Sequence, residues 1–136
     1  MEMVSAAARE KKWVVWTGWI ISALPVLMLL FSAAGKIFVH SSENDKFIEE
    51  HLGWPVRYMT GLAILEICCT LLYLIPQTAV LGAILVAAYL GGATATHVRV
   101  GDVPIFQVVL GMLAWLGLLL REPRLRPLLP IRRLGR

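Results

Sequence analysis

The sequence predicts an all-α membrane protein: a polytopic four-helix bundle with a short amphipathic interfacial helix between the first and second spanning helices. Of its 136 residues, 58% are hydrophobic and 16% are charged, whereas ordinary globular domains are about 45–50% apolar and about 25% charged. Several apolar runs approach or exceed the roughly 20 residues that cross a bilayer. The alternating pattern of a membrane-spanning barrel is missing, so the backbone must satisfy its hydrogen bonds within helices.

The expected spanning helices cover residues 13–38, 56–75, 79–98 and 103–120. The second and third are joined by Pro76, Gln77 and Thr78, a turn short enough to make them an antiparallel hairpin. Between the third and fourth, Gly101 suits a tight turn and Pro104 suits the start of a helix.

The connection between the first and second helices differs from the other two. It runs from His40 to Pro55, is polar and acidic, and carries the small apolar set Phe47, Ile48 and Leu52. This pattern predicts a short amphipathic helix at the membrane surface, with Ser42 or Asn44 as its N-cap.

Basic residues predict the orientation, because Lys and Arg near spanning helices are retained on the cytoplasmic side. Three precede the first helix and six follow the last: Arg9, Lys11, Lys12, Arg121, Arg124, Arg126, Arg132, Arg133 and Arg136. The other side carries Lys36, Lys46, Arg57 and Arg99. We therefore expect a multi-pass protein of the cell (inner) membrane with both termini cytoplasmic.

The charge distribution also divides the chain into a transmembrane domain over residues 1–122 and an Arg/Pro-rich cytoplasmic tail over residues 123–136. A basic segment beside a membrane is attracted to anionic lipid, so membrane lipid is the expected partner of the tail and nucleic acid is not. A cleaved secretory signal is the alternative at the N-terminus. The run from Trp13 to Phe31 exceeds the roughly 7–15 residues of a signal core, which argues against cleavage.

The third helix carries small residues at helical spacing. Ala83, Ala87, Gly91 and Ala95 recur every four residues, and Ala88, Gly92 and Thr96 form a second stripe beside them. Such stripes let helices approach closely in membranes, so we expect this helix to be the central one of the bundle. An exposed small-residue face would also permit a dimer.

Glu66 is the candidate functional residue. It lies near the middle of the second helix, where an acidic residue costs roughly 2.5–3.5 kcal/mol to insert. Lys36 is the candidate cation, but at 1.5 Å rise per residue it lies roughly 14 Å nearer the surface, so direct contact needs a tilted helix or water. A hydrogen-bond network through Tyr89 is the competing expectation. His97 and Arg99 lie at the same membrane level as Lys36.

Several segments together resemble the DoxX-like family of small four-helix membrane proteins: "FSAAGKIF", "LGWP", "GLAILEI" and "IPQTAVLGAILVAAYLGGATATHVRVGD". The resemblance covers roughly residues 29–102. It matches the family pattern at Gly35, Lys36, Glu66 and Pro76, and along the run Gly91, Gly92, Ala93, Ala95, His97, Arg99 and Gly101. It implies a four-helix membrane fold and an association with redox chemistry, because relatives in the wider superfamily resemble a membrane subunit of thiosulfate:quinone oxidoreductase. A redox partner subunit is implied on the same ground.

No cofactor signature is recognisable in the chain, and no metal site is expected. His40, His51 and His97 are not spaced to ligate a haem between helices. Cys68 and Cys69 are adjacent and do not form the C-x-x-C of thiol exchange.

Three functions remain open. In the first, Lys36, Glu66, Tyr89, His97 and Arg99 bind a lipophilic, quinone-like ligand beside a redox partner, and His97 exchanges protons near neutral pH. In the second, Glu66 is a catalytic acid or base acting on an isoprenoid-like substrate. In the third, the bundle is a non-catalytic scaffold or accessory protein whose buried polar residues fix the helix register. The sequence leaves open whether the protein is an enzyme.

Overall fold

The computed structural model describes residues 2–129 of the chain, with side chains over residues 12–129, and this part is helical without strands. The long helices are α1 (Glu2–Phe38), α3 (Met59–Leu74), α4 (Ala79–Arg99) and α5 (Ile105–Arg121). Between α1 and α3 lie the five-residue helix α2 (Ser42–Lys46), a π-helical turn η1 (Phe47–His51) and a 3₁₀ turn η2 (Val56–Tyr58). A second 3₁₀ segment, η3 (Pro123–Leu128), follows α5.

The predicted membrane bundle is confirmed, with small differences at the helix ends. Three segments are long and apolar enough to cross a membrane: Lys12–Phe38, Val56–Leu74 and Ala79–Arg99. Helix α5 is apolar and has 17 residues, about 26 Å of helix and the lower limit for a span. Helix α1 begins at Glu2 rather than near residue 13, since nothing in the polar stretch before Trp13 breaks a helix.

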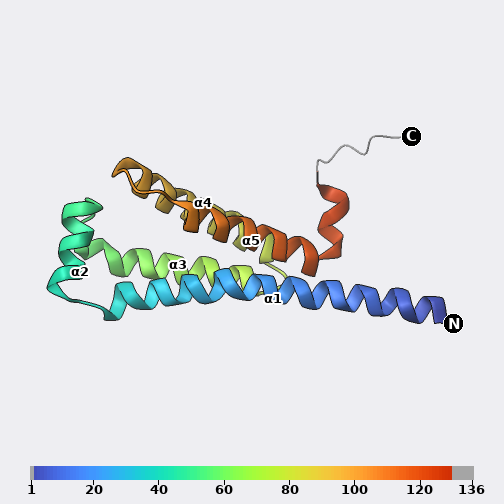
Figure 1. Ribbon diagram of the computed structural model, residues 1–136. Helices are drawn as coiled ribbons and strands as arrows, with labels where there is room; N and C mark the ends of the chain where they lie inside the picture. The colour runs from blue at the N-terminus through green and yellow to red at the C-terminus, as the bar shows by residue number, and fades with distance from the viewer. Residues whose placement is uncertain (1, 130–136) are drawn as a thin grey trace.

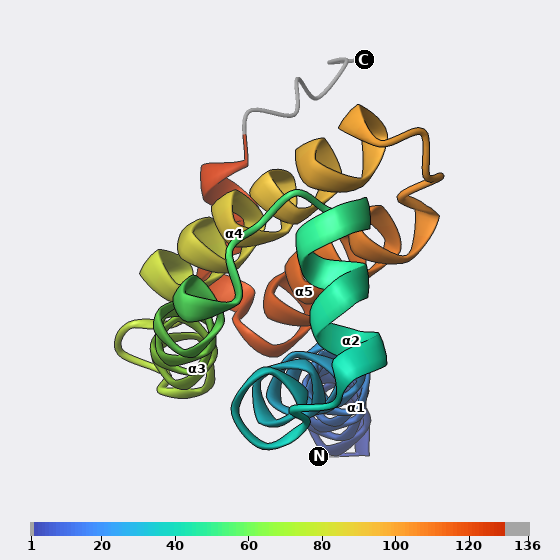
Figure 2. The ribbon, with the colours of Figure 1, turned by 90° about the vertical axis from the view of Figure 1, so that its left-hand side faces the viewer.

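The four long helices form a ring in two layers. Helix α1 packs along α3 and α5, and α4 packs along the same two neighbours. No member of this ring is central, so the expectation that α4 is the central helix is wrong. Figure 1 shows the layer of α4 and α5 diverging from the layer of α1 and α3 toward the end where α2 lies, and Figure 2 views the bundle from that end.

Glycines bring the helices together at the end opposite α2, which carries the turn at Pro76 and is called the hairpin end below. A Cβ on Gly82 of α4 would collide with the backbone of Leu72 and Tyr73 in α3. A Cβ on Gly18 of α1 would collide with the backbone of Arg121 in α5. The missing side chains let these backbones touch, as small residues do in membrane helix pairs.

The small-residue stripe of α4 packs only over its first turns. Ala83 is fully buried, whereas Ala88, Gly91, Gly92 and Ala95 are exposed. A Cβ on Gly91 or Gly92 would meet nothing within 4 Å. The two layers diverge along α4 (Figure 1), so less of the α4 surface is packed against neighbouring helices toward its C-terminal end.

The polar connection folds into a cap, defined here as residues 42–51, that lies across the wider end of the bundle (Figure 2). Its N-cap is Ser41, whose hydroxyl accepts a hydrogen bond from the Asn44 backbone at 3.2 Å. The N-cap of α2 is therefore one position earlier than the predicted Ser42, because Ser41 has the extended backbone that an N-cap requires. Ile48 is the buried residue of the cap.

The end of α5 is packed more deeply than its position next to the basic tail suggests. Arg121 is buried, with its guanidinium 4.4 Å from the Trp19 ring centroid and 4.3 Å from that of Tyr73. It also donates a hydrogen bond to the Tyr73 carbonyl. Of the predicted irregular tail, residues 123–128 form a 3₁₀ helix, and residues 130–136, with Arg132, Arg133 and Arg136, lie outside the described part.

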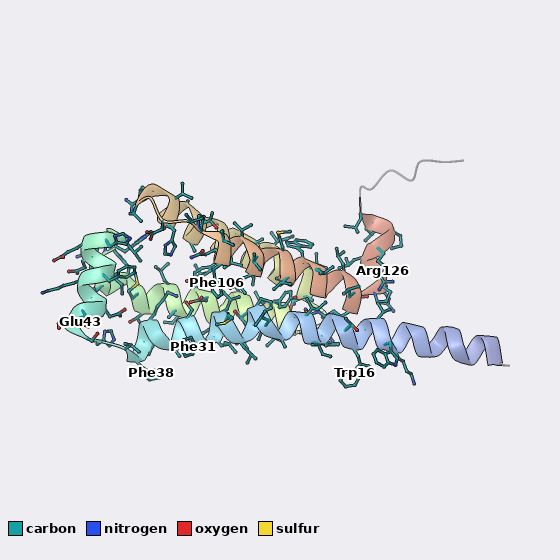
Figure 3. The ribbon with its side chains drawn as sticks, viewed as in Figure 1. Trp16, Phe31, Phe38, Glu43, Phe106 and Arg126 are labelled. Carbon is teal, nitrogen blue, oxygen red and sulfur yellow. The ribbon has the colours of Figure 1, made fainter. Side chains whose placement is uncertain are left out.

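The outer surface of α1 is mostly apolar from Trp13 to Phe38. Trp16, Phe31 and Phe38 point away from the bundle (Figure 3) and are about 70–80% exposed. Tryptophan is enriched where a spanning helix meets the headgroups, and Trp13 and Trp16 lie together at the hairpin end of α1. This surface suits lipid rather than water.

Candidate functional site

Glu66 and Lys36 form a direct ion pair. Lys36 Nζ lies 2.8 Å from Glu66 Oε2. The Glu66 side chain is 2% exposed and that of Lys36 is 22% exposed. Ser32, one turn before Lys36, accepts a hydrogen bond from Lys36 Nζ at 2.5 Å and lies 3.5 Å from Glu66 Oε2. The contact that seemed to require a tilted helix or water is made by the side chains themselves.

The directions of the two helices explain how these side chains bridge the difference in depth. Side chains on an α-helix lean toward its N-terminus. Helix α1 ends at the cap and α3 begins there, so Lys36 leans inward and Glu66 leans toward the cap. Each side chain therefore covers part of the difference in depth between Lys36 and Glu66 that the helical rise predicts.

The ion pair lies on the wall of a cavity of 410 Å³. All four long helices and the chain between the cap and η2 line it, mostly with apolar side chains such as Met28, Leu62 and Leu110. Eight of the lining residues carry polar side chains: Ser32, Lys36, Trp54, Glu66, Tyr89, Thr96, His97 and Gln107. An apolar space with a few convergent polar groups is the usual form of a small-molecule site.

Tyr89 and His97 both reach this cavity. The Tyr89 ring centroid is 5.9 Å from Lys36 Nζ, so the ring packs beside the ion pair and not between its members. The two hydrogen bonds that Glu66 accepts from described side chains both go to Oε2. Oε1 accepts no hydrogen bond of normal length from the described side chains, and the Tyr89 hydroxyl lies near enough to the Glu66 carboxylate to interact with it.

Arg99 lies elsewhere. It does not line the cavity, and instead its guanidinium donates a hydrogen bond to the Leu52 carbonyl at 2.5 Å. It also packs under Gly53, where φ is +71° and a Cβ would approach the guanidinium at 3.2 Å. Arg99 thus binds the end of the cap, and the structure separates it from the other four predicted ligand-binding residues.

A histidine–aspartate–histidine cluster joins the cap to α4. Asp102 accepts from His97 Nδ1 at 3.0 Å, and its two oxygens lie 3.1 and 3.0 Å from His51 Nε2. Hydrogen bonds from His97 and then His51 hold the pKa of the Asp102 carboxyl below its ordinary value. Because His97 also lines the cavity, the cluster connects the cavity wall to the exposed surface of the cap.

Sequence reasoning missed four of the polar lining residues. Ser32 and Gln107 each carried a usable signal: Ser32 precedes Lys36 by one helical turn, and Gln107 is the sole polar side chain besides Trp115 between Ile105 and Leu120. Trp54 and Thr96 carried none, because their pairing, with Trp54 Nε1 donating to Thr96 Oγ1 at 3.3 Å, joins positions 42 residues apart.

The cysteines lie away from this chemistry. Cys69 is buried in the core and Cys68 is exposed, and both thiols are free. Within the part of the chain that the structure describes, no three His, Cys, Asp or Glu side chains are grouped to hold a metal ion.

The fold and this site define a small helical membrane protein with an internal cavity and a buried ion pair on the cavity wall. The chain belongs to the DoxX-like family, whose sequence model matches residues 20–117. The matched part includes every cavity-lining residue. No curated protein and no solved structure matches the chain significantly.

Proposed function

We propose that the protein binds a lipophilic molecule with an uncharged, hydrogen-bonding head group of the quinone kind in the cavity beside Glu66. The observation that carries this proposal is the Lys36–Glu66 ion pair on the wall of a 410 Å³ apolar cavity. That volume lies within the roughly 300–1,000 Å³ of small-molecule sites.

The balance of charge favours an uncharged head. The Lys36 ammonium and the Glu66 carboxylate neutralise each other at 2.8 Å, and a phosphate or carboxylate head would need a second cation. The remaining ionisable groups on the wall are Tyr89 and His97, and His97 is engaged with Asp102.

The hydrogen-bonding groups suit both redox forms of a quinone. An ammonium donates to a quinone carbonyl, and a carboxylate oxygen accepts from a quinol hydroxyl. Lys36 and Glu66 Oε1 provide one group of each kind. Oxidation of a quinol releases two electrons and two protons. In this proposal the electrons pass to a redox partner subunit that carries its own cofactor, and the two protons leave by way of the Glu66 carboxylate and His97, which both line the cavity.

The cavity also bears on the other two hypotheses, the scaffold and the acid–base enzyme: it argues against the first and is compatible with the second. A scaffold whose polar residues only fix helix register is expected to enclose Glu66 in apolar side chains, whereas Glu66 reaches a cavity together with Lys36 and His97. An acid–base enzyme acting on an isoprenoid-like substrate would use the same cavity, with Glu66 as its catalytic group. It differs from the quinone site in requiring turnover of the bound molecule.

Native mass spectrometry with lipid extraction tests ligand binding. We expect a quinone or isoprenoid to co-purify with the wild-type protein. The amount bound should be smaller in Glu66→Gln and in Tyr89→Phe. The Tyr89→Phe substitution removes one hydroxyl without disturbing the ion pair. Cys68→Ser is the control, since Cys68 lies on the same helix and is exposed to lipid. An empty wild-type protein would refute ligand binding, and chemical conversion of a bound isoprenoid would favour the acid–base enzyme.

We further propose that the protein lies in the cell membrane with both termini cytoplasmic. Helix α5 ends beside the start of the α1 span, as the contact between Gly18 and Arg121 requires, and basic residues flank both helices there. Reporter fusions at the two termini should give the cytoplasmic signal. A periplasmic signal at either terminus would contradict this orientation.

A further inference from the structure

The cavity is not closed on every side, and exposed residues of α3 and α4 line one of its walls. At the hairpin end these helices touch, since Gly82 lies against the backbone of Tyr73. Nearly three turns further along α4, a Cβ on Gly92, which lines the cavity, would meet nothing within 4 Å. The two helices have therefore separated at the level of the cavity.

Three residues at this separation face both the cavity and the outside. Leu65 of α3 lines the cavity and is 50% exposed. Ala88 and Gly92 of α4 line the cavity and are also exposed. In a bilayer, their exposed sides face hydrocarbon. A side chain that touches both environments forms the rim of an opening, and this rim contains two of the smallest residues.

The cap and the side of α5 bound the other approaches to the cavity. The cap lies across the wide end, fastened through His51 to Asp102 and through Arg99 to the Leu52 carbonyl. In Figure 2 the cap lies in front of α5, whereas the chain that passes in front of α4 is the connection leading to α3. On the side of α5, Phe106 also lines the cavity and is 56% exposed, but it places a large ring there, whereas the side between α3 and α4 carries Ala88 and Gly92.

We infer that the bound molecule carries an apolar tail that leaves the cavity sideways through the gap between Leu65, Ala88 and Gly92. This inference rests on the proposed function and narrows its ligand class to tailed molecules dissolved in the bilayer. The head lies at Glu66, which is almost fully buried and has one oxygen without a hydrogen bond from the described side chains. The tail lies among the lipid chains.

The physical reason is the cost of moving an apolar chain through water. A molecule dissolved in the bilayer that enters by the lateral gap brings its head to the ion pair while its tail stays in hydrocarbon throughout. Entry past the polar cap would expose the whole tail to water, which the hydrophobic effect opposes. With the lateral route, the tail can be longer than the cavity volume of 410 Å³ would hold, because it lies outside the cavity.

The test compares two quinones with the same head in lipid nanodiscs: a dimethoxy-methyl-benzoquinone without a tail, and its analogue with a decyl chain. The variants are Gly92→Leu and Ala88→Leu, which place a large side chain on the rim. The matched control is Gly91→Leu, because Gly91 is the neighbouring open glycine and does not line the cavity. Replacing either helical glycine by leucine favours the helix, so loss of folding is not the expected effect.

We expect each rim variant to bind the decyl quinone about tenfold more weakly than the wild type and to bind the tail-less quinone equally well. Gly91→Leu should bind both as the wild type does. Equal decyl binding in wild type and both rim variants would overturn the lateral gap. Equal loss of both quinones would place Gly92 and Ala88 against the head and also overturn it. Failure of the wild type to bind either quinone would refute the quinone site itself, which is a separate outcome.

Discussion

The side chains of Lys36 and Glu66 meet at 2.8 Å although the two residues lie at different depths in two antiparallel helices. The pair is asymmetric, since Lys36 keeps a route to the surface at 22% exposure and Glu66 does not at 2%. Removing one partner therefore has a different consequence from removing the other.

Lys36→Met should destabilise the protein by about 3 kcal/mol, the cost of leaving a buried charge unpaired. Glu66→Gln should cost less, because the lysine ammonium can turn toward water. The double variant Lys36→Met with Glu66→Leu should recover most of the loss, since neither charge remains. Thermal unfolding in detergent measures all three, and a double variant no more stable than Lys36→Met would show that the two residues do not act as a pair.

Gly82→Leu should destabilise the α3–α4 hairpin by about 1–3 kcal/mol, because the new side chain forces apart two backbones that touch. Gly61→Ala in α3 is the matched comparison. Its Cβ meets nothing within 4 Å, so this substitution should stabilise the helix by up to about 1 kcal/mol. Shifts of the unfolding midpoint in opposite directions for the two variants would support the close approach of α3 and α4 at Gly82. Shifts in the same direction would contradict it.

Tyr73→Phe should lower stability by about 1 kcal/mol. The Tyr73 hydroxyl lies 2.8 Å from the Ser22 hydroxyl and donates to the Ala114 carbonyl at 2.6 Å. The substitution removes both hydrogen bonds and keeps the ring against Arg121. Tyr58→Phe is the control, because that hydroxyl lies near the surface, where its partner is Arg57. Unfolding curves that coincide for wild type and Tyr73→Phe would mean that the buried bonds contribute nothing.

Asp102→Asn should loosen the cap, because it removes the carboxylate that holds His51 and His97. Hydrogen exchange of residues 42–51 should become faster, and Glu50→Gln, on an exposed position of the same segment, should leave it unchanged. Equal protection of the cap in wild type and Asp102→Asn would contradict the anchoring role.

The pH dependence of this anchor follows from the lowered pKa of Asp102. A carboxyl with a depressed pKa in the folded state stabilises that state above its ordinary value of about 3.9, and the contribution is lost as the pH falls through the depressed value. Cap protection, corrected for the intrinsic pH dependence of exchange, should therefore persist at pH 5 and disappear only below about pH 4. Loss of protection already at neutral pH would point to a group other than Asp102.

The sequence by itself determined the kind of protein and most of its elements. Long apolar runs separated by turn residues admit little besides membrane-spanning helices, because lipid offers the backbone no hydrogen-bond partners. The same reasoning located the hairpin at Pro76, the polar cap, and Glu66 as the charge that needs an explanation. The expected interfacial helix ended within a few residues of the observed cap.

Only the tertiary structure decided what surrounds that charge. Whether Lys36 or Tyr89 satisfies Glu66 depends on the direction in which each side chain leans and on how far the helices splay, and neither is a property of one segment. Arg99 shared the depth of His97 in the sequence yet faces the cap rather than the cavity. The small residues of α4 predicted a packing surface along the whole helix, but Ala88, Gly91, Gly92 and Ala95 are exposed. Local patterns state which faces can pack, whereas the angle between two layers decides which of them do.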